Sequence, residues 1–191
     1  EQGPVDKRSL TFSSGPLVHD LLVSGAVSAH LSASSSAVDT DWVVRLCDVF
    51  PDGRSLNVVE GIQRARFRES ASAPSLLQPG HIYDYTVRMS ATEYLFRAGH
   101  RLRITVGSSS YPRWSRNLNV AAFPEQAVEW TVARNAIHVD AAHPSWVELP
   151  ILSADAVACR HGKDAAPSGE RGALPMEAMP CPKPGGSEYP R

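Results

Sequence analysis

Serine, histidine and acidic side chains can together cleave ester and amide bonds. A serine hydrolase carries its nucleophile in the motif G-x-S-x-G, whose small flanking residues permit the strained turn that exposes the hydroxyl. The nearest match here is Gly107-Ser-Ser-Ser-Tyr111, centred on Ser109. It lacks the second glycine, and Pro112 follows where a helix should begin. We predict that Ser109 lies in a loop after a strand, and that the chain has no catalytic residue of its own.

Histidines could act as bases or metal ligands, and the chain has seven: His19, His30, His81, His100, His138, His143 and His161. No pair has the H-x-x-x-H spacing of a helical metal site, and no Cys or Asp joins them at ligand spacing. We predict no metal and no cofactor. His100 follows Gly99 at a tight turn, which favours a structural role for both residues over a catalytic one.

Charge and cysteine content exclude several classes of partner. The 19 basic and 20 acidic residues give a net charge of −1, so we expect neither nucleic acid nor an anionic membrane. No apolar run approaches the ~18 residues of a membrane span. The cysteines Cys47, Cys159 and Cys181 form no C-x-x-C pair, and their odd number argues against a disulfide framework. This weakly favours the cytoplasm, and the compartment stays open.

Asp39 and Asp41 flank Thr40 immediately before an apolar run that starts at Trp42. Paired carboxylates could hold Ca²⁺ or serve as an acid and base. The structural interpretation, which we favour, is that they accept backbone N–H bonds and fix the turn. Asp41 could also pair with a cation such as Arg45 or one of the arginines of segment 64–68.

Arg64, Arg66 and Arg68 alternate with Ala65 and Phe67, so in a strand they would share one face. Flanking Glu60 and Glu69 make a nucleic-acid surface improbable. Two interpretations stay open: an interdomain contact through the arginine forks, or a solvated strand face.

The loop 111–119 concentrates residue types that are enriched at recognition surfaces. We select five as candidate interdomain or ligand contacts: Tyr111, Arg113, Trp114, Arg116 and Asn117. One use would be packing on another domain near a substrate cleft. Another would be stacking Trp114 or Tyr111 on a sugar.

Apolar and polar residues alternate with period two in several segments, a pattern that is typical of strands. It predicts strands in the following segments: 10–12, 27–33, 42–49, 82–89, 102–106, 128–132, 137–139 and 146–151. Turns are predicted at Pro51-Asp-Gly53, Gln78-Pro-Gly80 and Ala98-Gly99. Short strands at such spacing with little helix indicate an all-β sandwich or jelly roll.

Composition divides the chain into three parts. Residues 1–16 are expected to be a lead-in segment and residues 17–152 a jelly-roll domain. Residues 153–191 hold six prolines and five glycines, and we expect this tail to be disordered. The first residue is Glu and no basic-then-apolar leader follows, so we expect a fragment or a chain whose start is missing.

Several segments in fixed order carry a family resemblance: residues 36–42, 49–54, 61–69, 95–104 and 108–119. They resemble the C-terminal domain of the Xaa-Pro dipeptidyl-peptidase and cocaine-esterase group of serine hydrolases. The resemblance covers about residues 9–152. In the family the loop commonly reads S-S-N-F-P-x-x-D-R-N; here Tyr111 replaces Phe and Ser115 replaces Asp, whereas Arg116 and Asn117 are kept.

The resemblance implies a galactose-binding-like jelly roll that follows an α/β-hydrolase domain, supports it and helps to wall its active-site entrance. The nucleophile, acid and base would lie in that domain, and a peptide or small-molecule substrate would meet this chain only through it. Asp39 and Asp41 would stand at the entry to a buried strand. Two alternatives remain: a stand-alone carbohydrate-binding module, and a purely structural interaction domain. Homo-oligomer formation also stays open.

Overall fold

A computed structural model describes residues 9–152 and 170–178 of the chain. These residues form strands and two short 3-10 turns, and the alternation of their sequence explains which positions extend. The elements are β1 (Leu10–Ser13), β2 (Leu21–Ser35), β3 (Asp41–Val49), β4 (Ser55–Arg64), η1 (Ala65–Phe67), β5 (Ile82–Phe96), β6 (Arg101–Gly107), β7 (Asn135–His138), β8 (Trp146–Leu152), β9 (Glu170–Pro175) and η2 (Met176–Ala178).

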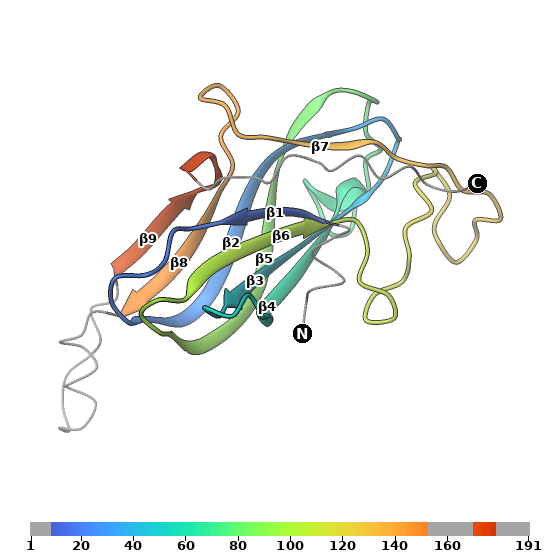
Figure 1. The fold of residues 1–191 in the computed structure, drawn as a ribbon. Helices are drawn as coiled ribbons and strands as arrows, with labels where there is room; N and C mark the ends of the chain where they lie inside the picture. The colour runs from blue at the N-terminus through green and yellow to red at the C-terminus, as the bar shows by residue number, and fades with distance from the viewer. Residues whose placement is uncertain (1–8, 153–169, 179–191) are drawn as a thin grey trace.

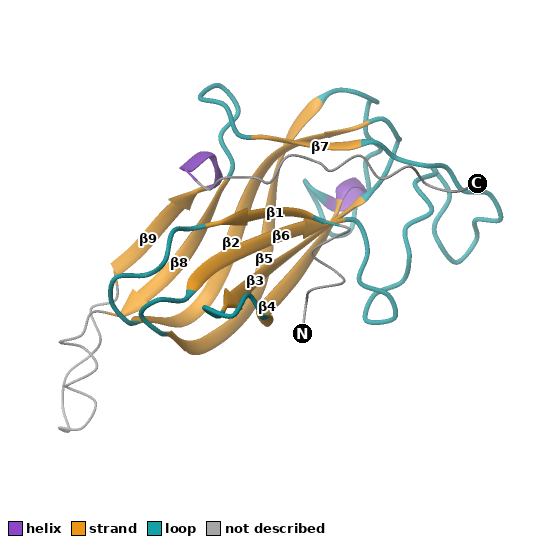
Figure 2. Cartoon of the chain, viewed as in Figure 1, coloured by secondary structure: helices purple, strands orange, loops and turns teal. Residues whose placement is uncertain are grey.

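The strands form a curled antiparallel sheet that folds into two layers (Figures 1 and 2). The strand order is β1-β6-β3-β4-β5-β2-β8-β9, with β7 paired to β2. The first layer holds β1, β6, β3 and β4, and the second holds β5, β2, β8, β9 and β7. The predicted all-β sandwich is confirmed.

Gly61 on β4 joins the two layers through its pairing with Met89 on β5. A Cβ atom at Gly61 would lie 2.4 Å from the carbonyl oxygen of Arg88. Only glycine therefore allows the two backbones to approach this closely.

The core lies between the layers and is built from the inward side of each alternation. On β2 the buried apolar side chains are Val23, Val27, Ala29, Leu31 and Ala33. Trp42 on β3 packs against Tyr85 on β5, with ring centroids 5.5 Å apart. Removing such apolar area from water is the main force that holds the two layers together.

Two strand assignments from the sequence need correction. Segment 128–132 belongs to no strand, and Val128, Trp130 and Val132 are exposed. Alternation indicates an extended chain, whereas a strand also needs hydrogen bonds to a neighbouring strand.

The sequence analysis did not predict β4. Arg66 lies in η1 rather than on a strand face, so the three arginines do not share a face.

The lead-in and the tail also need correction. β1 pairs with β6, and Phe12 is buried in the core, so the sandwich includes residues before 17. In the tail, β9 pairs with β8, and Met176 is buried at the core edge. Residues 170–178 are thus ordered where we expected disorder, and the rest of the tail lies outside the described residues. Within the described parts no helix is long or apolar enough to cross a membrane.

Candidate functional site: the β6–β7 loop and its anchor

Residues 108–134 connect β6 to β7 and form the β6–β7 loop, which extends beyond the end of the sandwich (Figure 1, yellow to orange). It contains the five candidate contact residues of segment 111–117. An irregular segment of this length keeps one shape only if its backbone groups find partners. Side chains from the start of β3 and the end of β4 provide them.

Asp39 and Arg66 form the centre of this arrangement. Asp39 accepts bonds from the backbone N–H of Arg66 at 2.9 Å and from Arg66 Nε at 2.8 Å. Both side chains are almost fully buried, at 0% and 2% exposure. Arg66 Nη2 donates to the carbonyl oxygens of Val120 (2.8 Å) and Ala122 (3.2 Å), and the guanidinium lies over the Phe123 ring.

Asp41 and Arg64 form a second pair beside the first. Arg64 Nε and Nη2 donate to the two carboxylate oxygens of Asp41 at 2.9 and 3.2 Å. The same Nη2 also reaches the Ser115 carbonyl and hydroxyl oxygens. Burial acts to lower the pKa of Arg64, but the hydrogen bond and charge of Asp41 outweigh it and the pKa is raised.

Asn117 joins the two pairs. Its Nδ2 donates to Asp39 at 2.8 Å and to Asp41 at 2.9 Å, and its Oδ1 accepts the backbone N–H of Asn119 at 2.8 Å. We call Asp39, Asp41, Arg64, Arg66 and Asn117 the buried anchor. Every member is bonded to another member, and three of them, Arg64, Arg66 and Asn117, also bond to the loop backbone. A satisfied network of this kind fixes a loop in one arrangement.

Asp41 pairs with Arg64, one of the cations that the sequence left open as its partner. Asp39 accepts a backbone N–H, whose donor is Arg66 in η1. The bonds of Arg66 lie within the domain and its side chain is 2% exposed, so a solvated strand face is wrong for this residue. Arg64 also binds within the domain, with 18% of its side chain exposed.

A third ion cluster holds the beginning of the loop. Glu60 on β4 accepts bonds from Arg45 Nε and Arg113 Nη1, each at 2.8 Å, and Ser110 lies 3.5 Å away. The Arg113 guanidinium also covers Trp114, 4.9 Å from the ring centroid. Arg113 thus braces the loop and keeps Trp114 in place, and Arg116 is exposed to solvent.

Large apolar side chains on the loop face solvent. The exposed ones are Tyr111 (70%), Phe123 (39%), Val128 (95%), Trp130 (70%) and Val132 (72%). We call these five the apolar loop set. Apolar side chains exposed on one loop are candidates for an interaction surface. Of these five, the sequence pointed to Tyr111 only; the alternation at 128–132 was the available signal for Val128, Trp130 and Val132.

Two clusters of acid and imidazole in the structure could suggest a catalytic triad. At the end of β3, His100 Nδ1 lies 2.9 Å from Asp48 Oδ1, but the neighbouring hydroxyl, Tyr94 Oη, donates to Asp48 rather than to the imidazole. A triad nucleophile must contact the imidazole nitrogen opposite the acid. This cluster does not show that order, and the structural role of His100 stays a prediction.

The second cluster lies on the outer face of β2. Ser28 Oγ is 3.4 Å from both His30 Nε2 and Glu148 Oε2, and Glu148 lies 3.8 Å from the same Nε2. Acid and hydroxyl therefore occupy one side of the ring, so Glu148 cannot orient His30 as a triad acid does. Ser109 lies in the loop after β6, as predicted. Among the described residues, no group of three or more acidic, His or Cys side chains could hold a metal ion.

Fold and site together define a two-layer β domain with a projecting braced loop. Comparison with known proteins agrees. The chain is 42% identical over 161 residues to the cocaine esterase of Rhodococcus sp. (strain MB1 Bresler), covering 80% of this chain and 28% of that protein. It resembles an alpha-amino acid ester hydrolase structure with a TM-score of 0.76 and 33% identity, over 79% of this chain and 27% of that one. An aminopeptidase from a Thaumarchaeota archaeon gives a TM-score of 0.73 at 29% identity, over 80% and 27%.

Residues 3–148 match the X-Pro dipeptidyl-peptidase C-terminal non-catalytic domain, and the chain belongs to this family. It spans little more than a quarter of the length of the relatives named above. None of these three is described as a carbohydrate-binding module. The family resemblance found in the sequence is confirmed.

Proposed function

We propose that this chain serves as the non-catalytic C-terminal domain of a serine hydrolase and docks on its α/β-hydrolase domain through the β6–β7 loop. The observation that carries the proposal is the apolar loop set, which faces solvent although the buried anchor fixes the loop beneath it. Docking would remove this area from water at no great ordering cost, since the loop is already held.

The parent enzyme would form an acyl-enzyme at a serine of the preceding domain and then hydrolyse it. The 42% identity to a cocaine esterase supports an ester as the parent's substrate, and the other family members keep peptides and amides open. Tyr111, Arg113, Trp114, Arg116 and Asn117 would lie at or behind the interface. In this arrangement the loop would form part of the wall of the active-site entrance.

Docking can be tested in trans, with a separately produced α/β-hydrolase domain of the proposed parent enzyme. We expect the 191-residue chain to bind that core and to lose the binding when Val128, Trp130 and Val132 are all changed to Ser. Val18 is 81% exposed and lies outside the loop, so Val18→Ser is a matched control that should bind normally. Analytical size-exclusion chromatography and calorimetry would measure the complex.

Binding that survives the triple substitution would contradict docking through the loop. The isolated chain should also leave p-nitrophenyl esters and Gly-Pro-anilides unhydrolysed. Turnover that Ser109→Ala abolishes would show that the chain is itself catalytic and would refute the proposal as a whole.

A further inference from the structure

The hydrogen-bond ladders on both sides of β2 are interrupted at the same level. The register with β5 shifts between Ala26 and Ser28, and the register with β8 shifts between Val23 and Ser28. Gly25 has φ +136°, and a Cβ there would lie 3.1 Å from the Pro150 ring on β8. Proline has no N–H to donate to a ladder. Gly25 and Pro150 thus face each other at the point where the hydrogen bonds between β2 and β8 are interrupted.

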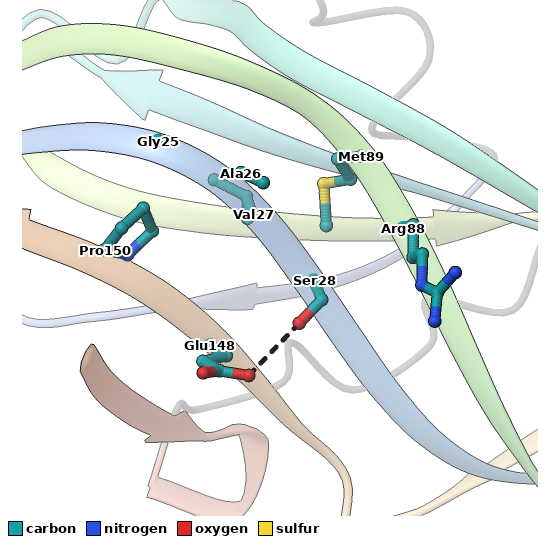
Figure 3. A pocket seen from close by; sticks show the side chains of 8 residues that line it. All are labelled: Gly25, Ala26, Val27, Ser28, Arg88, Met89, Glu148 and Pro150. Carbon is teal, nitrogen blue, oxygen red and sulfur yellow. Dashed lines mark hydrogen bonds between the residues drawn. The ribbon is translucent and has the colours of Figure 1, made fainter.

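A pocket of about 380 Å³ lies at this interruption (Figure 3). Its volume is in the range of small-molecule sites. Ala26, Val27, Met89 and Pro150 give it an apolar lining, and Val27 and Met89 are otherwise core residues. Val27 and Met89 are buried, at 1% and 5% exposure, so the apolar surface open to a ligand is mainly that of Ala26 and Pro150.

Charged side chains of opposite sign stand on the two sides of this pocket. Arg88 on β5 and Glu148 on β8 are both register partners of Ser28, so the three form one row across three strands. Figure 3 shows Ser28 between them, with its hydroxyl 3.4 Å from Glu148 Oε2. Since neighbouring strands are ~4.8 Å apart, the Cα atoms of Arg88 and Glu148 are separated by roughly 10 Å. The pocket thus has a cationic side, an anionic side and an apolar floor.

We propose that this pocket binds a compact zwitterion of dipeptide size. Its carboxylate would pair with the Arg88 guanidinium, which suits a planar two-oxygen acceptor. Its ammonium would bind Glu148 and the Ser28 hydroxyl; a carboxylate has about four acceptor sites and can keep its present bond. A short apolar side chain would lie on Ala26 and Pro150. Two residues span about 7 Å, which fits between the charged heads.

Glycyl-leucine is a suitable probe, with two analogues that each lack one charge: N-acetyl-glycyl-leucine and glycyl-leucinamide. In ¹⁵N-HSQC titrations of the 191-residue chain, we expect saturable shifts in residues 25–28, 88–89 and 148–150 with glycyl-leucine. Each analogue should bind at least about tenfold more weakly, because one charged bond is lost.

Two kinds of variant test the assignment. Arg88→Gln and Glu148→Gln should each weaken glycyl-leucine binding by about tenfold. Ala26→Leu should fill the pocket and abolish binding without any change of charge, whereas Ser90→Leu, at an exposed position of β5, should leave it intact. The HSQC spectrum of each free variant reports whether it is folded. Absence of saturable shifts at about 10 mM probe, equal binding of the analogues, or normal binding to Ala26→Leu would overturn the proposal.

Discussion

The two ends of β3 both bury a carboxylate, yet they do so with different partners. At the start, Asp39 and Asp41 bind guanidinium groups and Asn117, and these bonds extend into the β6–β7 loop. At the end, Asp48 binds the His100 imidazole, which precedes β6, and the Tyr94 hydroxyl of β5, which belongs to the other layer. The first arrangement positions a surface, and the second closes the end of the sandwich.

The difference shows why guanidinium partners are used at one end only. A guanidinium has several donors in a fixed fork, so one arginine can bind a carboxylate and loop carbonyls together. A tyrosine hydroxyl or imidazole nitrogen serves one acceptor at a time. Holding a long loop requires several donors on one side chain, whereas closing the end of the sandwich does not.

The largest effect is expected when the charge at the start of β3 is removed. Asp39→Asn leaves Arg66 buried without its counter-charge, so the free energy of unfolding should fall by about 3–5 kcal/mol. Chemical denaturation monitored by Trp fluorescence would measure it. Asp52→Asn is the control: its pair with Arg54 is exposed to solvent, so its removal should leave the stability nearly unchanged. Similar losses in the two variants would mean that the buried anchor is not a stabilising unit.

At the other end, Asp48→Asn should cost less. It removes a charged acceptor from Tyr94 and His100 but leaves no permanently charged group buried alone, so we expect a loss of about 1–3 kcal/mol. The same denaturation experiment applies. A loss larger than that of Asp39→Asn would reverse the comparison between the two ends.

Tyr94 gives the Asp48 end a pH dependence. Burial, followed by the hydrogen bond and charge of Asp48, raises the pKa of Tyr94 to about 12 from an ordinary value of 10.0. The protonated hydroxyl therefore stabilises the fold fully below pH 10, and this contribution is lost as the pH rises from 10 toward 12.

Tyr94→Phe should cost about 1 kcal/mol near neutral pH and flatten the fall in stability above pH 10. Burial also raises the pKa of Tyr85 to about 12, and this residue stays in both proteins. Unfolding free energies measured from pH 9 to 11 would therefore report Tyr94 by difference. Parallel curves for the two proteins would contradict the assigned bond to Asp48.

The smallest effect is expected for Arg113→Ala. The Arg113 side chain is 56% exposed, and Glu60 keeps its bond to buried Arg45, so stability should change by less than about 1 kcal/mol. The mobility of Trp114 should increase instead, because the guanidinium that covers it is gone. Time-resolved Trp fluorescence anisotropy would detect the change, and an unaltered decay would show that Arg113 does not hold Trp114.

Much of the fold could be predicted from alternation. The segments 27–33, 42–49, 82–89, 102–106 and 146–151 all lie on strands. β4 was missed because Gly61 and its polar neighbours do not alternate cleanly, and its pairing depends on strands distant in the chain. The exposed segment 128–132 shows the opposite failure: it alternates but finds no partner strand. Asp41 was correctly paired with an arginine, whereas the link through Asn117 was not foreseen.

The sequence alone determined the layered β architecture, the family and the loop that carries the recognition residues, because side-chain alternation and motif order are local properties. Tertiary structure decided which arginine binds which carboxylate, which apolar side chains stay in water, and where the ladders of β2 open. These depend on contacts between residues 20 to 120 positions apart, and only the closed fold brings such residues together.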